Sequence, residues 1–262
     1  MLGPRGDARL VAACRGTGRC PRSRRVRSLL AVARLALVIF DLDDTLFDHE
    51  GATREALAGW LVGLGVEPTE ELVGAWFAAE SRHVAAWHRG ELDWQGQRRA
   101  RVEEMLSVVG RPAGDAGSLE RSFGEYLSRY EAAWRVFPDV EPALRALERE
   151  RLEIAVLSNG ADYQQREKLA AVGLSQRIGR VFCSDAIGFA KPDVRAFNYV
   201  CEKLGRDPSA VLSVGDRHDL DVVAARAAGL RAVHIDRANA GPADEPCRIT
   251  SLVDLPRFLT GD

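Results

Sequence analysis

Two aspartates separated by one residue, Asp41 and Asp43, follow a continuous apolar run. In an open α/β sheet, ligands bind at the carboxyl ends of the strands, so acids directly after a strand stand where a site belongs. If the backbone coils there, the two carboxylates converge. One can then act as a nucleophile or metal ligand, while the other exchanges protons with a leaving group. A solvated acidic turn would explain the same residues, and this motif alone leaves both interpretations open.

Three later segments carry groups suited to phosphate or to metal ions. Ser158-Asn159-Gly160 follows another apolar run and offers a hydroxyl and freely oriented backbone amides to phosphate oxygens. Lys191 stands before a proline and a predicted helix, where it can offset negative charge, although Lys-Pro is also typical of a helix start. A further apolar run leads into Asp216, Asp219 and Asp221, of which we expect only Asp219 to be a simple helix cap.

Short apolar runs alternate with helical patterns over most of the chain. Continuous apolar runs are typical of strands buried on both faces. The predicted strands span residues 35–40, 152–157, 181–183, 211–214 and 232–235, and the predicted helices span 162–172, 194–204 and 220–228. Gly173, Gly205 and Gly229 stand at the expected C-caps of those helices. This alternation predicts a doubly wound α/β domain with a parallel sheet, a Rossmann-like core.

Residues 53–134 show helical spacing throughout, with breaks near Pro68, Gly90–Asp93 and Pro112. We expect about four helices and no strand there, an insertion too long for a simple crossover. The predicted domains are therefore an α/β core of residues 35–52 and 135–262 and an all-helical cap of residues 53–134. All five tryptophans lie in this cap, and we expect most of them in its core. Trp87 and Trp94 flank a turn and are the expected exceptions.

The overall composition disfavours several classes of protein. The 262 residues carry a formal net charge of −2, which gives no basic footprint for nucleic acid or for an anionic membrane. No run of eighteen apolar residues exists, so no transmembrane helix is expected. The five cysteines include no C-x-x-C pair, which disfavours a disulfide framework or a zinc site and favours a cytoplasmic location.

Residues 1–34 form an arginine-rich extension with nine arginines against one acid, Asp7. An export signal or a transit peptide could have such a composition. However, the only long apolar run nearby, residues 35–40, is needed as the first strand. We therefore expect a disordered extension that lacks the apolar surface to offset the entropy of ordering.

Taken in order, the four motifs resemble those of the haloacid dehalogenase-like hydrolase superfamily over residues 35–235. The helical insertion resembles the cap of that superfamily, and the segment Gln165-Arg166-Glu167-Lys168 resembles its branch of sugar-phosphate phosphatases and nucleotidases. The resemblance implies Mg²⁺-dependent hydrolysis of a small phosphomonoester through an aspartyl-phosphate intermediate. It implies no nucleic-acid or membrane partner and leaves the oligomeric state open.

The resemblance also implies a role for each motif residue. Asp41 matches the nucleophile, Asp43 the general acid and base, and Lys191 the lysine that steadies the nucleophile and the phosphoryl charge. The matched phosphate-binding positions are Ser158, Asn159 and Gly160; the matched Mg²⁺ ligands are Asp41, the Asp43 carbonyl, Asp216 and, through a water, Asp221. The chain departs from its relatives at Arg217 and Leu220, where they often carry serine and asparagine.

Several alternatives stay open. Dehalogenases in the superfamily lack an acid at the position of Asp43, because a halide leaving group needs no proton. Phosphomutases share the same acids, and a non-catalytic phosphate-binding protein is a further alternative. Residues of the cap select the substrate, and a solvated helix face would equally explain the two arginines among the candidates, which are Trp87, His88, Arg98 and Arg101.

Overall fold

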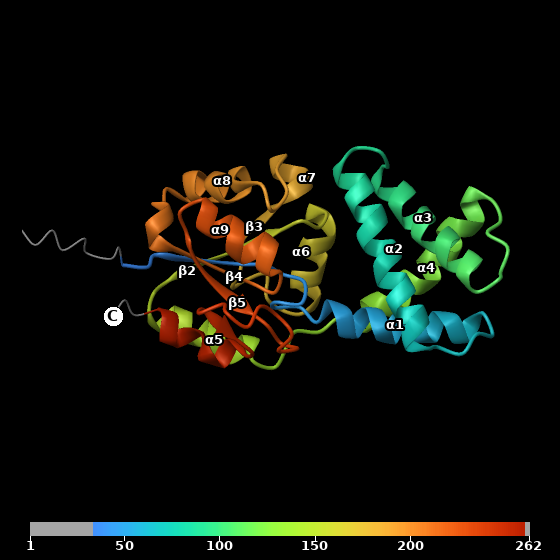
Figure 1. The fold of residues 1–262 in the computed structure, drawn as a ribbon, viewed down its shortest axis with the longest axis horizontal. Coiled ribbons are helices and arrows are strands. Elements are labelled where there is room, and N and C mark those ends of the chain that lie inside the picture. The colour runs from blue at the N-terminus through green and yellow to red at the C-terminus, as the bar shows by residue number, and fades with distance from the viewer. Residues whose placement is uncertain (1–33, 260–262) are drawn as a thin grey trace, which may run out of the picture. The chain divides into compact units, whose positions relative to one another are not determined.

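The computed structural model describes residues 34–259, so the predicted disordered extension lies outside the described residues except for Arg34. Six strands form one parallel sheet in the order β3-β2-β1-β4-β5-β6 (Figure 1). Their bounds are β1 Leu37–Phe40, β2 Glu153–Ser158, β3 Arg180–Cys183, β4 Val211–Gly215, β5 Arg231–Ile235 and β6 Arg248–Ile249. The predicted doubly wound parallel sheet is confirmed. The two-residue strand β6 was not predicted, because so short a strand has no apolar run to mark it.

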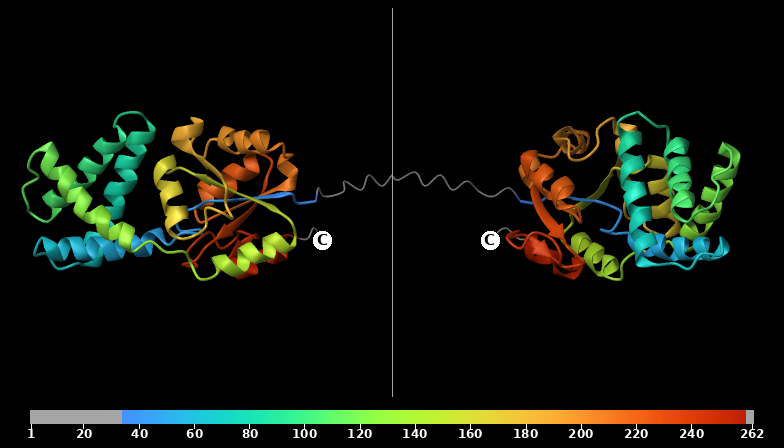
Figure 2. Two further views of the ribbon diagram at one scale, coloured as in Figure 1. Left: turned by 180° about the vertical axis from the view of Figure 1, so that it is seen from behind. Right: turned by 45° about the vertical axis from the view of Figure 1, so that its right-hand side comes forward.

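Helices cover both faces of the sheet, as Figures 1 and 2 show. On one face Ile39 of β1 belongs to an apolar cluster with Phe197 of helix α8 (Val194–Leu204), and on the other Phe40 belongs to a cluster with Leu144 of helix α5 (Val140–Arg149). This burial of alternate side chains explains why β1 is apolar at every position. The helices of the core are α5 Val140–Arg149, α6 Asp162–Ala171, α7 Ser184–Ile187, α8 Val194–Leu204 and α9 Ala224–Ala227, with 3₁₀ turns at Pro208–Ala210 and Leu252–Phe258.

The helix that follows β4 differs from the prediction. In place of one α-helix over residues 220–228, a π-helical segment at His218–Val223 precedes the short helix α9. Asp221 ties this segment to its surroundings: its carboxylate accepts a hydrogen bond from the Arg217 backbone N–H at 3.0 Å, and its carbonyl accepts one from the hydroxyl of Ser213 on β4 at 3.0 Å. Contacts from outside the helix therefore shape this turn, and such π turns are frequent at functional sites.

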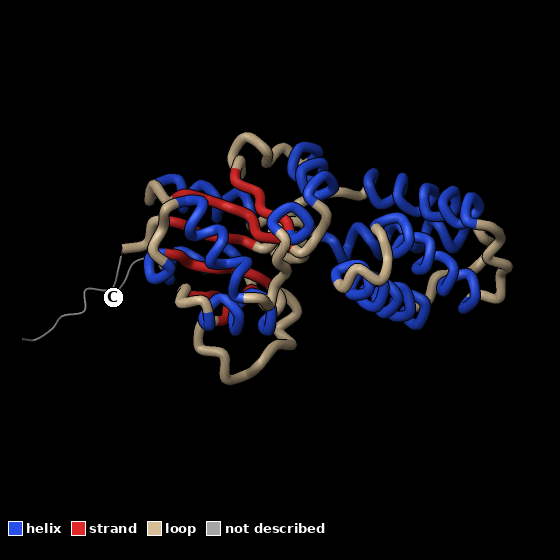
Figure 3. Tube along the Cα trace, turned by 90° about the horizontal axis from the view of Figure 1, so that it is seen from above, coloured by secondary structure: helices blue, strands red, loops and turns tan. Residues whose placement is uncertain are grey.

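Four helices and no strand occupy residues 53–134, all of which the structure describes (Figure 3). They are α1 His49–Gly63, α2 Glu70–His88, α3 Trp94–Val108 and α4 Ala116–Ala132. A side-chain oxygen caps the start of each helix, from Asp48, Thr69, Asp93 and Asp115. Because Asp48 caps α1, that helix begins at His49, ahead of the expected cap boundary at residue 53.

Apolar packing inside the cap involves the first two tryptophans. Trp60 and Trp76 are almost fully buried, and their ring centroids lie 5.8 Å apart. The ring of Tyr126 on α4 lies 4.4 Å from that of Trp76, which ties α4 to α2. These tryptophans form the core of the cap, as expected. Among residues 34–259, no helix combines the length and the apolar character that crossing a membrane requires.

Candidate active site

A cavity of about 680 Å³ lies at the carboxyl ends of the strands and is lined by both the core and the cap. The strand order changes direction between β1 and β4, and in such sheets ligands bind at that point. Seven of the eight predicted site residues line the cavity: Asp41, Asp43, Ser158, Asn159, Gly160, Lys191 and Asp216. The eighth, Asp221, is buried and contacts the Lys191 ammonium.

The Lys191 ammonium joins two of the predicted acids. Its Nζ lies 2.6 Å from Asp41 Oδ1 and 2.6 Å from Asp221 Oδ1, and the residue is only 5% exposed. Although burial opposes the charge, the two carboxylates raise the pKa of Lys191 above its usual value. The Asn159 side chain fixes this lysine, because it accepts a hydrogen bond from the Lys191 N–H at 2.8 Å and donates one to the Lys191 carbonyl at 2.7 Å. Asn159 therefore positions Lys191, a role that sequence analysis did not foresee.

Asp41, Asp216 and Asp221 form a compact carboxylate cluster. One oxygen of each lies within 4.8 Å of the others. Burial, together with the neighbouring carboxylates, raises the pKa of Asp41 to about 7 and that of Asp216 to about 9. Hard oxygen donors with excess negative charge suit Mg²⁺, so these residues fit the implied metal. The Asp43 carboxylate lies outside this cluster, in keeping with a resemblance that assigned only its carbonyl to the metal.

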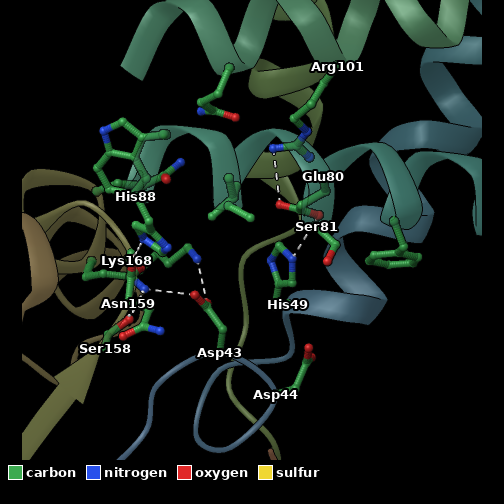
Figure 4. A pocket seen from close by; sticks show the side chains of 18 of the residues that line it. Asp43, Asp44, His49, Glu80, Ser81, His88, Arg101, Ser158, Asn159 and Lys168 are labelled. Atoms are coloured by element: carbon green, nitrogen blue, oxygen red, sulfur yellow. Dashed lines mark hydrogen bonds and ion pairs between the residues drawn. The ribbon is translucent and has the colours of Figure 1, made fainter. Parts of the chain in front are cut away.

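The Asp43 carboxylate is held by two side chains of α6 (Figure 4). Lys168 Nζ lies 2.5 Å from Asp43 Oδ1, and Gln165 Nε2 donates to Asp43 Oδ2 at 2.8 Å. Although burial opposes it, the charges of Lys168 and His49 lower the pKa of Asp43 below its usual value. Without ligand, Asp43 is therefore ionised at neutral pH.

In the sequence, Gln165 and Lys168 belong to the segment that resembles one branch of the family, and no role in the site was predicted for them. Their spacing of three residues, on the helix that directly follows Ser158-Asn159-Gly160, was the available signal, since such residues share a helix face. Gln165 Nε2 also donates to Ser158 Oγ at 2.7 Å, and the Gly160 N–H donates to the same oxygen at 3.0 Å. Gln165 thus links the Asp43 carboxylate to the phosphate-binding candidate Ser158.

On the cap side, a chain of charged groups begins at His49 (Figure 4). His49 Nε2 lies 3.4 Å from Glu80 Oε2, and Arg101 Nη1 lies 3.1 Å from Glu80 Oε1. Burial alone would raise the pKa of Glu80, but the charges of Arg101 and His49 lower it to about 2. Sequence analysis missed His49 and Glu80, because single polar residues on helices do not reveal which way they face.

The cap candidates have different surroundings. Arg98 and Arg101 are 8% and 6% exposed, so the solvated helix face considered for them is wrong. The His88 ring forms a hydrogen bond of 2.8 Å to the Asn159 carbonyl, which joins cap and core directly. Trp87 and Trp94 both line the cavity, unlike the tryptophans of the cap core.

The two positions that depart from the resemblance also line the cavity. The Arg217 side chain is 62% exposed and lies 3.8 Å from an Asp219 carboxylate oxygen. The carboxylate that pairs with Arg217 is therefore that of Asp219, not that of Asp216. Leu220 offers an apolar side chain to the cavity wall between Arg217 and Asp221.

Comparison with known proteins agrees with this geometry. The sequence model of the haloacid dehalogenase-like hydrolases matches residues 35–229. The chain belongs to this family. Within this hydrolase family, the chain is 31% identical over 226 residues to a phosphoserine phosphatase of Thermus thermophilus, covering 78% of this chain and 89% of that one. It is 28% identical over 207 residues to a glyceraldehyde 3-phosphate phosphatase of Methanothermobacter thermautotrophicus, covering 77% and 86% of the two chains.

Solved structures of this hydrolase family share the fold. A hydrolase of Bacillus subtilis, solved with bound magnesium, superposes with a TM-score of 0.73 at 21% identity and covers 87% of this chain and 99% of that one. A 2-haloacid dehalogenase of Pseudomonas syringae superposes with a TM-score of 0.60 at 29% identity and covers 86% and 98%. Because one of these structures is named a hydrolase and the other a 2-haloacid dehalogenase, the shared fold does not decide the chemistry. The chemistry must be argued from the residues of the site.

Proposed function

We propose that this hydrolase removes phosphate from a small phosphomonoester in a Mg²⁺-dependent reaction. The observation that carries the proposal is the Asp43 carboxylate, which lines the same cavity as Asp41 and is held in place by Lys168 and Gln165. An oxygen leaving group needs a proton and a halide does not, so this second acid favours a phosphate ester over a haloacid. The phosphatase names of the two sequence relatives support the same choice.

In the proposed reaction, an Asp41 carboxylate oxygen attacks phosphorus and the bond to the leaving oxygen breaks. Asp43 gives that oxygen a proton, which leaves an aspartyl-phosphate on residue 41. Asp43 then takes a proton from water, whose oxygen attacks phosphorus and releases inorganic phosphate and the free Asp41 carboxylate. The Lys191 ammonium, 2.6 Å from Asp41, offsets the repulsion between nucleophile and phosphate.

The first step requires a protonated Asp43, although this residue is ionised without ligand. A phosphate dianion that enters the cavity adds negative charge beside Asp43, and a nearby like charge raises the pKa of a carboxyl group. Substrate binding therefore favours uptake of the proton that the leaving group needs. The charges of Lys168 and His49 then favour its release.

Three groups are proposed to bind the phosphate itself: Ser158, the backbone of Asn159, and Gly160. The Ser158 oxygen already accepts from Gly160 N–H and Gln165 Nε2, so its own O–H is left to donate. A phosphate oxygen would accept that hydrogen bond. Asn159 contributes in addition through its hold on Lys191.

Mg²⁺ is proposed to bind the Asp41 and Asp216 carboxylates and the Asp43 carbonyl, with Asp221 acting through a water. The Asp221 carboxylate already accepts from Lys191 and from the Arg217 N–H, which suits an indirect role. When bound, the ion supplies positive charge for the phosphoryl oxygens. A cytoplasmic location stays a prediction from the cysteine pattern.

Phosphate release from p-nitrophenyl phosphate and from a panel of sugar and acid phosphates tests the proposal. We expect inorganic phosphate to appear with Mg²⁺ and to stop when EDTA removes the ion. Isomerised sugar phosphate without inorganic phosphate would identify a phosphomutase instead. No turnover of any ester, or turnover that EDTA leaves unchanged, would contradict the proposal.

A further inference from the structure

The wall of the cavity that α2, α3 and α4 form carries an excess of positive charge. Of the residues of α2, α3 and α4 that line it, only Glu80 is acidic. That carboxylate is shared by Arg101 and by His49, which α1 contributes. Arg98, one turn before Arg101 on α3, lines the same cavity and finds no carboxylate left on this wall.

Arg98 is a buried cation that forms no ion pair with a carboxylate among residues 34–259, and Glu131 acts on its charge only from a longer distance. Its guanidinium donates to the Tyr163 hydroxyl at 2.8 Å and lies 4.7 Å from the Trp94 ring centroid and 5.0 Å from that of Phe123. Burial lowers the pKa of Arg98, which shows that the surroundings do not fully compensate its charge. A buried charge is costly unless it is paired, so a site that retains one is ready for an anion.

Two neighbours of Arg98 on α3 carry further unsatisfied groups. Within the described part of the chain, Gln97 Oε1 and Arg101 Nε are buried and find no hydrogen-bond partner. Both residues line the cavity. Unpaired buried polar atoms are rare in folded proteins, and an acceptor from a ligand would satisfy the Arg101 donor.

We propose that the substrate carries a second anionic group, which Arg98 binds together with Arg101, at the cap end of the cavity. This inference rests on the proposed phosphatase function and narrows it to phosphomonoesters with a further carboxylate or phosphate. The planar guanidinium pairs with either group through charge-assisted hydrogen bonds. A cavity of about 680 Å³ leaves room for a small molecule between this wall and Asp41.

Matched substrate pairs test the inference in the wild-type protein with Mg²⁺. 3-Phosphoglycerate and glycerol 3-phosphate share a three-carbon skeleton and differ by a carboxylate. Fructose 1,6-bisphosphate and fructose 6-phosphate differ by a phosphate. In at least one pair, we expect kcat/KM to be higher by about tenfold or more for the member that carries the second anionic group. The pair that shows this difference identifies the second group as a carboxylate or a phosphate. Equal values in both pairs, or turnover of p-nitrophenyl phosphate without turnover of any member, would overturn the inference and leave the phosphatase function intact. No turnover of any ester, p-nitrophenyl phosphate included, would defeat the phosphatase function itself.

Substitution of Arg98 assigns the preference to this side chain. Arg98→Met should lower the anionic-to-neutral ratio of kcat/KM by about tenfold, because the charge-assisted hydrogen bonds are lost. Arg98→Lys, which keeps the charge, should recover part of the ratio. The matched control is Arg99→Met, since Arg99 is partly exposed and pairs with Glu120 at 2.7 Å. An unchanged ratio of kcat/KM in a folded Arg98→Met protein would contradict the role of Arg98. If Arg98→Met does not fold, the ratio of the Arg98→Lys variant is used instead, and a wild-type ratio in that variant would contradict the role.

Discussion

The two sides of the cavity carry opposite charge imbalances. On the core side, five carboxylates face three cations, the residues being Asp41, Asp43, Asp44, Asp216, Asp221, Lys168, Lys191 and Arg217. The wall formed by α2, α3 and α4 carries two arginines, Arg98 and Arg101, and one carboxylate, that of Glu80, which pairs with Arg101. The core side therefore lacks about as much positive charge as one divalent cation supplies, while the cap side lacks an anion. This difference is the basis of our proposal that the core performs the chemistry and that the cap selects the substrate.

The largest effect is expected from the core side, at the proposed nucleophile. Asp41→Asn should lower kcat for p-nitrophenyl phosphate by about 10⁴-fold or more, since an amide cannot form the covalent intermediate. The exposed Asp219 provides the control, and Asp219→Asn should turn over near the wild-type rate. Thermal melting checks that both variants fold. Near-normal turnover by Asp41→Asn would remove Asp41 from the mechanism.

The carboxylate cluster is tested next through its metal. Asp216→Ala should weaken Mg²⁺ binding by roughly a hundredfold or more, because a direct ligand is lost, and Asp219→Ala should leave it unchanged. Calorimetric titration of the two variants measures this. Equal affinities would overturn the assignment of Asp216.

Mg²⁺ binding should also depend on pH with a definite sign. Without metal, the pKa is about 7 for Asp41 and about 9 for Asp216, so protons compete with the ion below those values. The affinity of the wild-type protein should therefore rise from pH 6 to pH 9, with proton release on binding. An affinity that is constant over this range would show that the cluster is already ionised without metal.

On the cap side, Glu80→Gln should lower the free energy of unfolding at pH 7 by about 3 kcal/mol, since the pKa of Glu80 falls from 4.5 to about 2 in the folded protein. Because the folded pKa is the lower one, this contribution is complete above the unfolded value and is lost as the pH falls toward 2. Urea unfolding at pH 7 and pH 3 measures the change. The control is Glu120→Gln, at an exposed pair with Arg99, which should lower the free energy of unfolding by less than about 1 kcal/mol. Equal losses in the two variants would show that the Glu80 carboxylate does not stabilise the cap more than an exposed ion pair does.

The smallest effect is expected where core and cap meet, at Lys168. Its ammonium contacts Asp43 and lies 4.7 Å from the Phe47 ring centroid. Lys168→Met should lower kcat by roughly tenfold and change KM little, because the side chain positions Asp43 without binding the leaving group. Lys203→Met on the surface of α8 is the control. A change confined to KM would place Lys168 in substrate binding instead.

The core side could be predicted from the sequence because parallel strands end at one edge of the sheet. Any polar residue directly after a strand must lie there, which brought Asp41, Asn159 and Asp216 to one cavity. The cap side could not be predicted in the same way, because helical spacing does not reveal which face packs inward. Thus Glu80 was missed, and the burial of Arg98 contradicts a solvated face. The π-helical turn at Asp221 was missed because its contact with Ser213 on β4 leaves no mark in the helical spacing.

The proposed mechanism requires that Asp41 carry the phosphoryl group during turnover. Rapid acid quenching with substrate and Mg²⁺, reduction with borohydride and mass spectrometry of the peptides would locate it, because borohydride converts an aspartyl-phosphate to homoserine. The account predicts homoserine at residue 41 only, and none in Asp41→Asn or when substrate is left out. Homoserine at another aspartate, or none in a protein that turns over its substrate, would contradict it.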